Sequence, residues 1–398
     1  MIRQIQAWLV IIGMALGTAS VSAAITLPLG GYTRAGKCIP ISISEPLSEP
    51  ILADGAVPTH VAPGFTGIAP MLILTDSPGP MHAASSETPL KPLMPDQRLV
   101  GVAGSDSALA AEVFPGQTIL TVSLDSSNPL PGPPIAWETL DAVILDSSPP
   151  QLDELLSLGI SVAIRSSEKP DDRWPWRRIG QAWVMRPNLA GPGSAIGGEV
   201  VYLPTQAWTP GRSPELRRQI ALAGVLVVLV LLIPLLFRSK RGMLLTLAIF
   251  LLGSAAIGIW RRRIPVISSV EGQIIVRSPE LVQIDAWKYL AAGRSGGSGS
   301  FSNALPVVAS AGHASLIQLK MECDQTGAVT WSYTLPANAR LATLDRLIVV
   351  PGQVNLAAPR MPVTSPLHEL AKQGYLSAET HIAGQFGDGE WPSVFIEH

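Results

Sequence analysis

The chain has 398 residues, with 28 Lys and Arg against 30 Asp and Glu, and its formal net charge is −2 at neutral pH. This balance offers no electrostatic basis for nucleic-acid binding, and the length suggests two or three domains. The 36 Pro and 36 Gly indicate short strands and many turns rather than long soluble helices.

Residues 1–23 have the layout of a secretory signal peptide. Arg3 precedes an apolar run from Ala7 to Leu16, and small residues lead up to Ala23, after which we expect cleavage. An uncleaved signal anchor is the alternative, and it gives the same topology downstream. Both interpretations predict that the following segment is exported.

The first exported part divides into a β-rich subdomain at 24–66 and an α/β domain at 67–216. Partial alternation of apolar and polar residues predicts two short strands near the start of the subdomain. In the α/β domain we expect strands in 98–104, 117–125, 140–148 and 160–166. Between the last two we expect a short helix, forming a β-α-β unit.

The predicted helix of this unit carries its own boundary signals. Ser148 can cap it, prolines follow in the first turn, Asp153 and Glu154 lie near its positive end, and Gly159 can end it. Ligands gather at the carboxyl ends of strands in such sheets, so Asp146, Ser147 and Ser148 form a candidate ligand site. The alternative makes Ser148 a cap and Asp146 a turn residue, which are roles that these residue types favour.

Two uncharged apolar segments, 219–237 and 243–260, predict a transmembrane hairpin within 217–263. Each is about long enough, at roughly 1.5 Å per residue, to cross a hydrocarbon core of roughly 30 Å. The link 238–242 permits only an antiparallel arrangement. Because neither segment contains an ionisable residue, we expect a membrane anchor rather than an ion or proton path.

The basic residues around the hairpin conflict with the expected orientation. The link, which export would place inside, carries three positive charges, and the outer flanks carry six arginines. Positive-inside counting therefore favours the opposite orientation. We nevertheless expect both soluble parts on the extracytoplasmic side of the inner membrane, because an N-terminal signal commits the chain first.

Residues 264–398 contain several strand-like runs, which predict a β-rich, sandwich-like domain. A Gly/Ser segment at 293–302 is expected to be a flexible loop. It contains Ser295 in a formal GxSxG pattern, but no helix can follow, as a nucleophile elbow requires. Cys38 and Cys323 could form a disulfide, and two free buried thiols are the alternative.

Four segments support a resemblance: GGYTRAGKCIPISIS from Gly30, LDAVILDSS from Leu140, YLPTQAW from Tyr202, and the basic pair before the hairpin. They resemble uncharacterised exported membrane proteins of planctomycete-type bacteria, which join a β-subdomain to a region similar to class I glutamine amidotransferases. That chemistry needs a cysteine and an activating histidine. Residues 83–216 contain neither, so a fold of this kind would lack catalytic groups.

The sequence thus predicts an α/β plus β fold: an N-terminal β-subdomain, a small parallel α/β domain, a two-helix transmembrane hairpin and a C-terminal β-sandwich-like domain. No cofactor or metal spacing stands out. The expected partners are the lipid bilayer and an envelope protein, with no nucleic acid. The predicted role is a non-catalytic scaffold or accessory subunit of a bacterial envelope complex; the alternatives are an envelope hydrolase and a ligand-binding sensor.

Overall fold

A computed structural model describes the two parts of the chain that flank the apolar stretch. The described residues are 25–83, 86–104, 108–187, 267–292, 296–302, 304–307, 317–337, 339–352, 361–362, 381–384 and 393–397, with the single residues 224, 248, 251 and 253. The predicted signal peptide at 1–23 lies outside them, as does nearly all of the predicted hairpin. Within the described residues, no helix has the length and apolar character that crossing a membrane requires.

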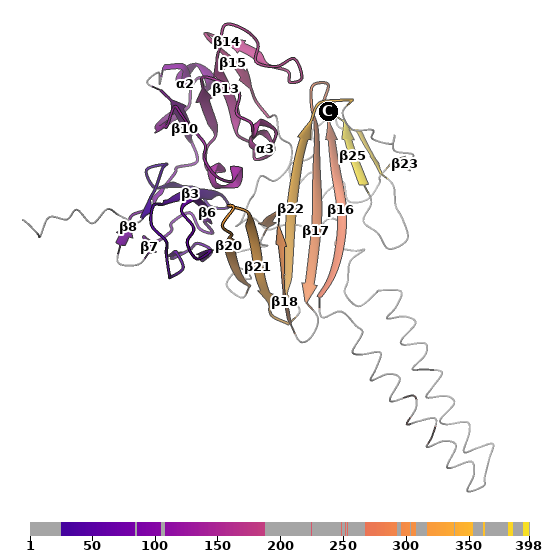
Figure 1. Ribbon diagram of the computed structural model, residues 1–398. Helices are drawn as coiled ribbons and strands as arrows, with labels where there is room; N and C mark the ends of the chain where they lie inside the picture. The colour runs from indigo at the N-terminus through magenta and orange to yellow at the C-terminus, as the bar shows by residue number, and fades with distance from the viewer. Residues whose placement is uncertain are drawn as a thin grey trace, which may run out of the picture.

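Strands dominate the described residues, and they form several small sheets and two larger ones (Figure 1). The first sheet has the order β1-β3-β6 and is antiparallel; two smaller sheets, β2-β9 and β4-β7-β8, lie in the same part of the chain. Their bounds are β1 Ile25–Thr26, β2 Tyr32–Thr33, β3 Cys38–Ile43, β4 Leu52–Ala53, β6 Gly67–Leu72, β7 Met81–Ala83, β8 Ser86–Thr88 and β9 Lys91–Pro92. Because β6 pairs with β3, the β-rich subdomain extends beyond the expected limit at residue 66.

The α/β unit has a six-stranded sheet in the order β11-β10-β12-β13-β15-β14. The first four strands pair with one another in parallel, as expected. β15 pairs antiparallel with β13, and β14 pairs antiparallel with β15, so the sheet ends in an antiparallel hairpin. The bounds are β10 Gln97–Ala103, α2 Ala108–Val113, β11 Thr118–Leu124, η1 Pro134–Trp137, β12 Ala142–Leu145, α3 Leu152–Ser157, β13 Ser161–Arg165, β14 Arg177–Ile179 and β15 Ala182–Met185.

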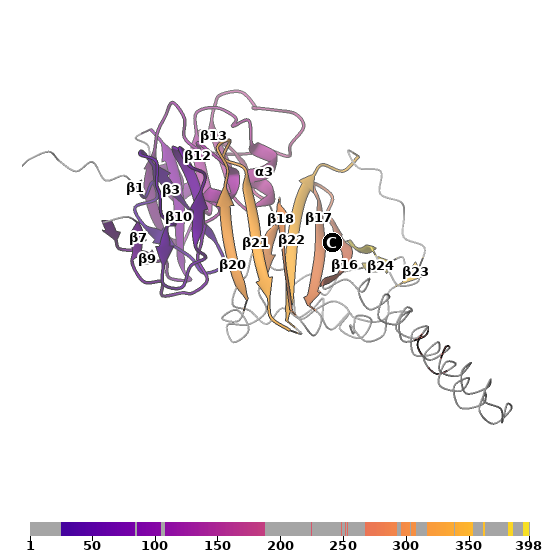
Figure 2. The ribbon, with the colours of Figure 1, turned by 60° about the horizontal axis from the view of Figure 1, so that its bottom comes forward.

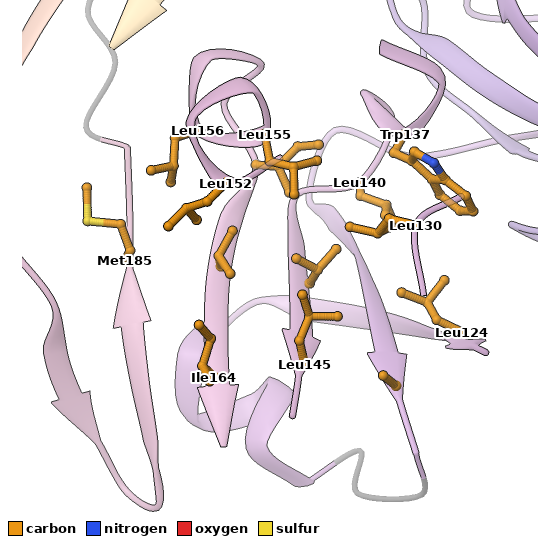
Figure 3. Close-up of a cluster of buried hydrophobic side chains, with 14 of the residues drawn as sticks. Leu124, Leu130, Trp137, Leu140, Leu145, Leu152, Leu155, Leu156, Ile164 and Met185 are labelled. Atoms are coloured by element: carbon orange, nitrogen blue, oxygen red, sulfur yellow. The ribbon is translucent and has the colours of Figure 1, made fainter. Parts of the chain in front are cut away.

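The two helices cover opposite faces of this sheet. Val143 and Leu145 of β12 belong to one cluster with the leucines of α3, and Figure 3 shows Leu145 with Leu152, Leu155 and Leu156 in this cluster. Ala142 and Ile144 pack with α2 on the other face. This alternation is what a strand buried on both sides requires. The helices therefore hold the carboxyl ends of β10, β12 and β13 in a fixed arrangement.

The predicted β-α-β unit is confirmed, with one correction at the start of its helix. The expectation that Ser148 caps α3 is wrong: the helix begins at Leu152, and its N-cap is Gln151, whose side chain makes no capping hydrogen bond to the helix. The two prolines at 149 and 150 explain the delay, because a residue preceding proline is disfavoured in the helical conformation. Gly159 follows the C-cap of α3 and ends the helix as expected, with a positive φ of 88°.

The C-terminal part forms two further sheets. A seven-stranded sheet has the order β19-β22-β17-β16-β25-β24-β23, and a four-stranded sheet has the order β18-β21-β20-β5. The bounds are β5 Thr59–Val61, β16 Ile267–Arg277, β17 Val282–Ala292, β18 Gly297–Ser302, β19 Leu305–Val307, β20 Gln318–Cys323, β21 Val329–Leu335, β22 Arg340–Val349, β23 Met361–Pro362, β24 His381–Gly384 and β25 Ser393–Glu397. The expected C-terminal β-sheet domain is therefore present.

The four-stranded sheet contains a strand from the N-terminal subdomain. Residues Thr59–Val61 of β5 pair in parallel with Met321–Cys323 of β20. Cys323 packs among residues of β3 and β6, and Cys38 packs in the cluster of β20 and β21. Figure 2 shows β20 and β21 between the N-terminal half and the tall strands β17 and β22. The C-terminal domain is consequently joined to the N-terminal subdomain by main-chain pairing.

The expectation of a flexible loop at 293–302 is wrong for its second half. Gly297–Ser302 forms β18 and pairs antiparallel with β21. A Cβ at Gly299 would lie 2.5 Å from Tyr333 Oη, so the small residue permits close approach of an aromatic partner. Phe301 stacks on Trp331 at a centroid distance of 6.3 Å. The glycines here serve close packing rather than flexibility.

Limited proteolysis provides a test of this joined architecture. With a protease site inserted between Pro210 and Ser213, we expect the two fragments to co-elute in size-exclusion chromatography of the detergent-solubilised protein. The β5–β20 pairing and the mixed hydrophobic clusters hold them together. Elution as separate fragments would contradict the shared sheet, and the chain lacking the inserted site serves as the control.

Candidate functional site

Asp146, Ser147 and Ser148, the predicted ligand residues, lie at the carboxyl end of β12, as expected. The Asp146 carboxylate, however, is already engaged by a side chain of the protein. Asp146 Oδ1 accepts a hydrogen bond from Arg165 Nε at 2.8 Å. The Arg165 guanidinium also donates to the carbonyl oxygen of Ala103, at the end of β10. Arg165 thus ties together the ends of three parallel strands. Ser147 and Ser148 are exposed beside this contact.

A hollow of about 520 Å³ lies next to Arg165, between α2 and the turn that joins β14 to β15. Its lining includes Ser166, Ser167, Glu112 and Arg178. Arg178 stands over the Trp183 ring, with its guanidinium carbon 5.8 Å from the ring centroid. The hollow therefore carries both charge signs, and Asp146 does not line it.

A larger cleft, of about 790 Å³, lies between the α/β unit and the two C-terminal sheets. Its walls come from η1 and α3 on one side and from β19, β21 and β22 on the other. The lining is mainly apolar and includes Ile135, Leu140, Leu158, Leu305, Val329, Trp331, Leu344 and Leu347. The sequence did not reveal this cleft, because its walls are almost two hundred residues apart in the chain.

One hydrogen-bonded contact fixes the two walls of the cleft. Ser157 Oγ, at the end of α3, accepts a hydrogen bond from the backbone N of Ile348 in β22 at 3.1 Å. The same hydroxyl donates to the carbonyl oxygen of Asp153 at 2.8 Å. The hydroxyl therefore supplies an acceptor to a backbone donor of β22 that lies beyond the residues paired with β19.

Each described cationic side chain that lines the cleft has a carboxylate partner. Lys37 Nζ lies 3.1 Å from Glu138 Oε1, and Arg34 Nη1 lies 2.9 Å from Asp141 Oδ1. Arg346 Nε lies 2.7 Å from Oδ1 of Asp285, a residue whose side chain is fully buried. These pairs are structural: Glu138 also accepts from the backbone N of Cys38, and Asp141 from that of Leu99. Each cleft cation therefore lies beside a carboxylate, although Asp141 is shared with Arg98, whose Nη1 also lies 2.9 Å from its Oδ1.

Two carboxylates of the cleft differ from the rest. Among the described residues, neither Glu154 of α3 nor Asp345 of β22 has a hydrogen-bond or ion-pair partner for its carboxylate. Asp345 lies at the exposed face of β22, yet the surrounding protein desolvates its carboxylate and raises its pKa above the ordinary value. The cleft thus combines apolar walls with uncompensated negative charge.

The two cysteines are free and buried in the structure, in line with the alternative to a disulfide. Burial, and then the nearby Glu138 carboxylate, raise the pKa of the Cys38 thiol well above its usual range. Burial raises the pKa of Cys323 to about 11. Nucleophilic chemistry needs a thiolate, so neither group is poised for it at neutral pH.

Ser295 lies outside the described residues, and a strand begins shortly after it in the chain. Gly296 has a φ of 70°, and β18 begins at Gly297. A nucleophile elbow requires a helix after the serine, because that geometry holds the hydroxyl strained and exposed. A strand in this place does not meet the requirement.

Comparison of the chain with protein families, with curated proteins and with solved structures finds no match. The expected likeness to planctomycete-type exported proteins with an amidotransferase-like region therefore stays a prediction. Any functional inference has to come from the geometry of the chain itself.

Proposed function

We propose that this protein is a membrane-anchored, exported protein without catalytic activity, which acts as a scaffold or accessory subunit of a bacterial envelope complex. The apolar segments 219–237 and 243–260 would anchor it in the inner membrane. The folded parts on either side would lie together outside the cytoplasm, where they would bind a partner protein.

The pairing of β5 with β20 is the observation that supports this proposal. Thr59–Val61 precede the apolar stretch and Met321–Cys323 follow it, yet they are neighbours in one sheet. Paired strands lie in the same compartment. A chain that leaves and returns to one compartment crosses the membrane an even number of times, and a two-helix hairpin satisfies this condition. A single membrane span between the two parts does not.

The groups available for chemistry favour a binding role over the envelope-hydrolase alternative. Both thiols are buried with raised pKa values, and Ser295 stands before a strand. The hydroxyl of Ser157 in the cleft is engaged in joining α3 to β22. The ligand-binding sensor is the other alternative, and the short link 238–242 offers it little material for a cytoplasmic output.

Cysteine labelling tests the proposed topology, with a design that takes account of the burial of the native thiols. In a Cys38→Ala, Cys323→Ala background, Met94→Cys and Gln318→Cys place exposed thiols on the two sides of the apolar stretch. In spheroplasts treated with a membrane-impermeant maleimide, we expect both to react before lysis. A Ser239→Cys variant, on the predicted link, should react only after lysis.

The outcomes separate the two parts of the proposal. If one of Met94→Cys and Gln318→Cys reacts before lysis and the other only after it, the hairpin is refuted. Reaction of both only after lysis would leave an even number of crossings but would refute export, and the positive-inside count would then give the correct orientation.

A further inference from the structure

The shape of the cleft between α3 and β22 suits a small ligand. Its volume of about 790 Å³ falls in the range of roughly 300–1,000 Å³ that is typical of small-molecule sites. The described residues include four exposed large apolar side chains, and Leu347, in the wall of the cleft, is one of them at 47% exposure. An apolar ligand body placed here would remove this surface from water.

The charge distribution of the cleft selects the sign of the ligand. Arg34, Lys37 and Arg346 each lie within 3.1 Å of a carboxylate. The lining carries these three cationic side chains and five carboxylates, Glu138, Asp141, Asp153, Glu154 and Asp345, so negative charge is in excess. Glu154 and Asp345, on the two facing elements, keep carboxylates that no described residue neutralises. The site is therefore electrostatically complementary to a cation.

We propose that this cleft is a binding site for a small organic cation, an ammonium or guanidinium group carried on an apolar body. The apolar body would lie against Leu347 and the neighbouring wall residues. The cationic group would bind in the part of the cleft that Glu154 and Asp345 line, where a carboxylate can accept a charge-assisted hydrogen bond. Such binding does not depend on the orientation of the membrane anchor.

A metal ion fits this site less well than an organic cation. Among the described residues, no group of three or more His, Cys, Asp or Glu side chains comes together as a metal-binding set. Hard cations such as Ca²⁺ take six to eight oxygen ligands, whereas one ammonium group is satisfied by two or three acceptors. The extensive apolar lining also favours a ligand with a hydrocarbon part.

Binding of matched probes to the detergent-solubilised full chain tests the proposal. Benzylamine, benzyl alcohol and benzoate share a ring but carry a positive, a neutral and a negative group. In isothermal titration and saturation-transfer NMR, we expect saturable binding of benzylamine and clearly weaker binding of the other two. Benzyl alcohol or benzoate binding as tightly as benzylamine would overturn the proposal, as would the absence of saturable benzylamine binding.

Isosteric variants locate the site. Glu154→Gln and Asp345→Asn should each weaken benzylamine binding by about tenfold or more, because each removes a charged acceptor from the site, and tenfold corresponds to about 1.4 kcal/mol. Glu322→Gln, which removes an exposed carboxylate of β20 outside the cleft, is the matched control and should have no effect. Leu347→Lys places a competing cation in the wall and should abolish binding. Unchanged affinity in the cleft variants would overturn the assignment.

These measurements do not involve membrane topology. Failure of the labelling experiment with a positive titration would leave the ligand site intact and remove the envelope role. If the titration shows no binding and the labelling gives the expected pattern, the ligand site is refuted and the envelope role is retained.

Discussion

Replacing Asp285 by Asn is expected to lower the free energy of unfolding by about 3–5 kcal/mol, because it removes the carboxylate charge that lies 2.7 Å from a nearly buried guanidinium. Asp285 is fully buried in β17, and the Arg346 guanidinium of β22 donates two hydrogen bonds of 2.7 Å each to its carboxylate. The Arg346 side chain is only 8% exposed. Denaturant unfolding of the detergent-solubilised chain, followed by tryptophan fluorescence, measures the loss.

The register of the sheet explains why this pair is sensitive to substitution. Asp285 and Arg346 are directly opposite each other in the antiparallel ladder of β17 and β22. Gln283 Nε2 donates a further hydrogen bond to Asp285 Oδ2 at 3.0 Å. The Asp285 carboxylate therefore accepts hydrogen bonds from both Arg346 and Gln283 in a buried network. Removing its charge weakens each of these contacts.

A surface pair in the same chain provides the control. Arg177 and Glu280 are also 2.7 Å apart, but their side chains are 73% and 50% exposed. Glu280→Gln should cost less than about 1 kcal/mol, since solvent screens exposed pairs. Equal losses in the two variants would show that the buried pair makes no special contribution.

Replacing both Asp285 and Arg346 by Leu and Met should recover much of the lost stability.

Replacing Trp331 by Ala is expected to cost about 3–5 kcal/mol, the range for removing a buried aromatic side chain. Trp331 is 1% exposed in β21 and lies in a cluster with Met321 of β20 and Leu290 of β17. The cluster also contains Cys38 and Leu72 from before the apolar stretch. A cavity at Trp331 would thus loosen both C-terminal sheets and their contact with the N-terminal subdomain.

The unfolding curve distinguishes this effect from a local one. Because the cluster joins parts of the chain from both sides of the apolar stretch, Trp331→Ala should move a single cooperative transition of the soluble parts to lower denaturant concentration. Trp331→Phe keeps the stack on Phe301 and should cost clearly less. Two separated transitions in the Ala variant, with the α/β unit unchanged, would contradict a shared core.

Local sequence signals located the α/β unit well. The runs around β10, β11, β12 and β13 were predicted because strands are short and rich in apolar residues, and Gly159 marks the end of α3. The start of α3 was missed because Ser148 has the residue type of a cap, whereas the two prolines after it delay the helix.

The candidate site was only partly foreseen. Strand order places Asp146 at the carboxyl edge of the sheet, but its pairing with Arg165 depends on the neighbouring strand and could not be derived from spacing. The cleft that carries Glu154 and Asp345 forms only when α3 meets β22. No local sequence pattern predicts this contact, because Glu154 and Asp345, taken singly, are typical of solvent-exposed acidic residues.

The sequence by itself determined the local elements: apolar segments long enough to span a membrane, a β-α-β unit, and a C-terminal part rich in strands. These elements are encoded by composition and periodicity within short windows. Only the tertiary structure decided that Gly297–Ser302 is a strand, that β5 joins β20, and that Asp285 meets Arg346. Strand pairing is non-local: its energy comes from cross-strand partners and shared burial, which a single segment does not encode.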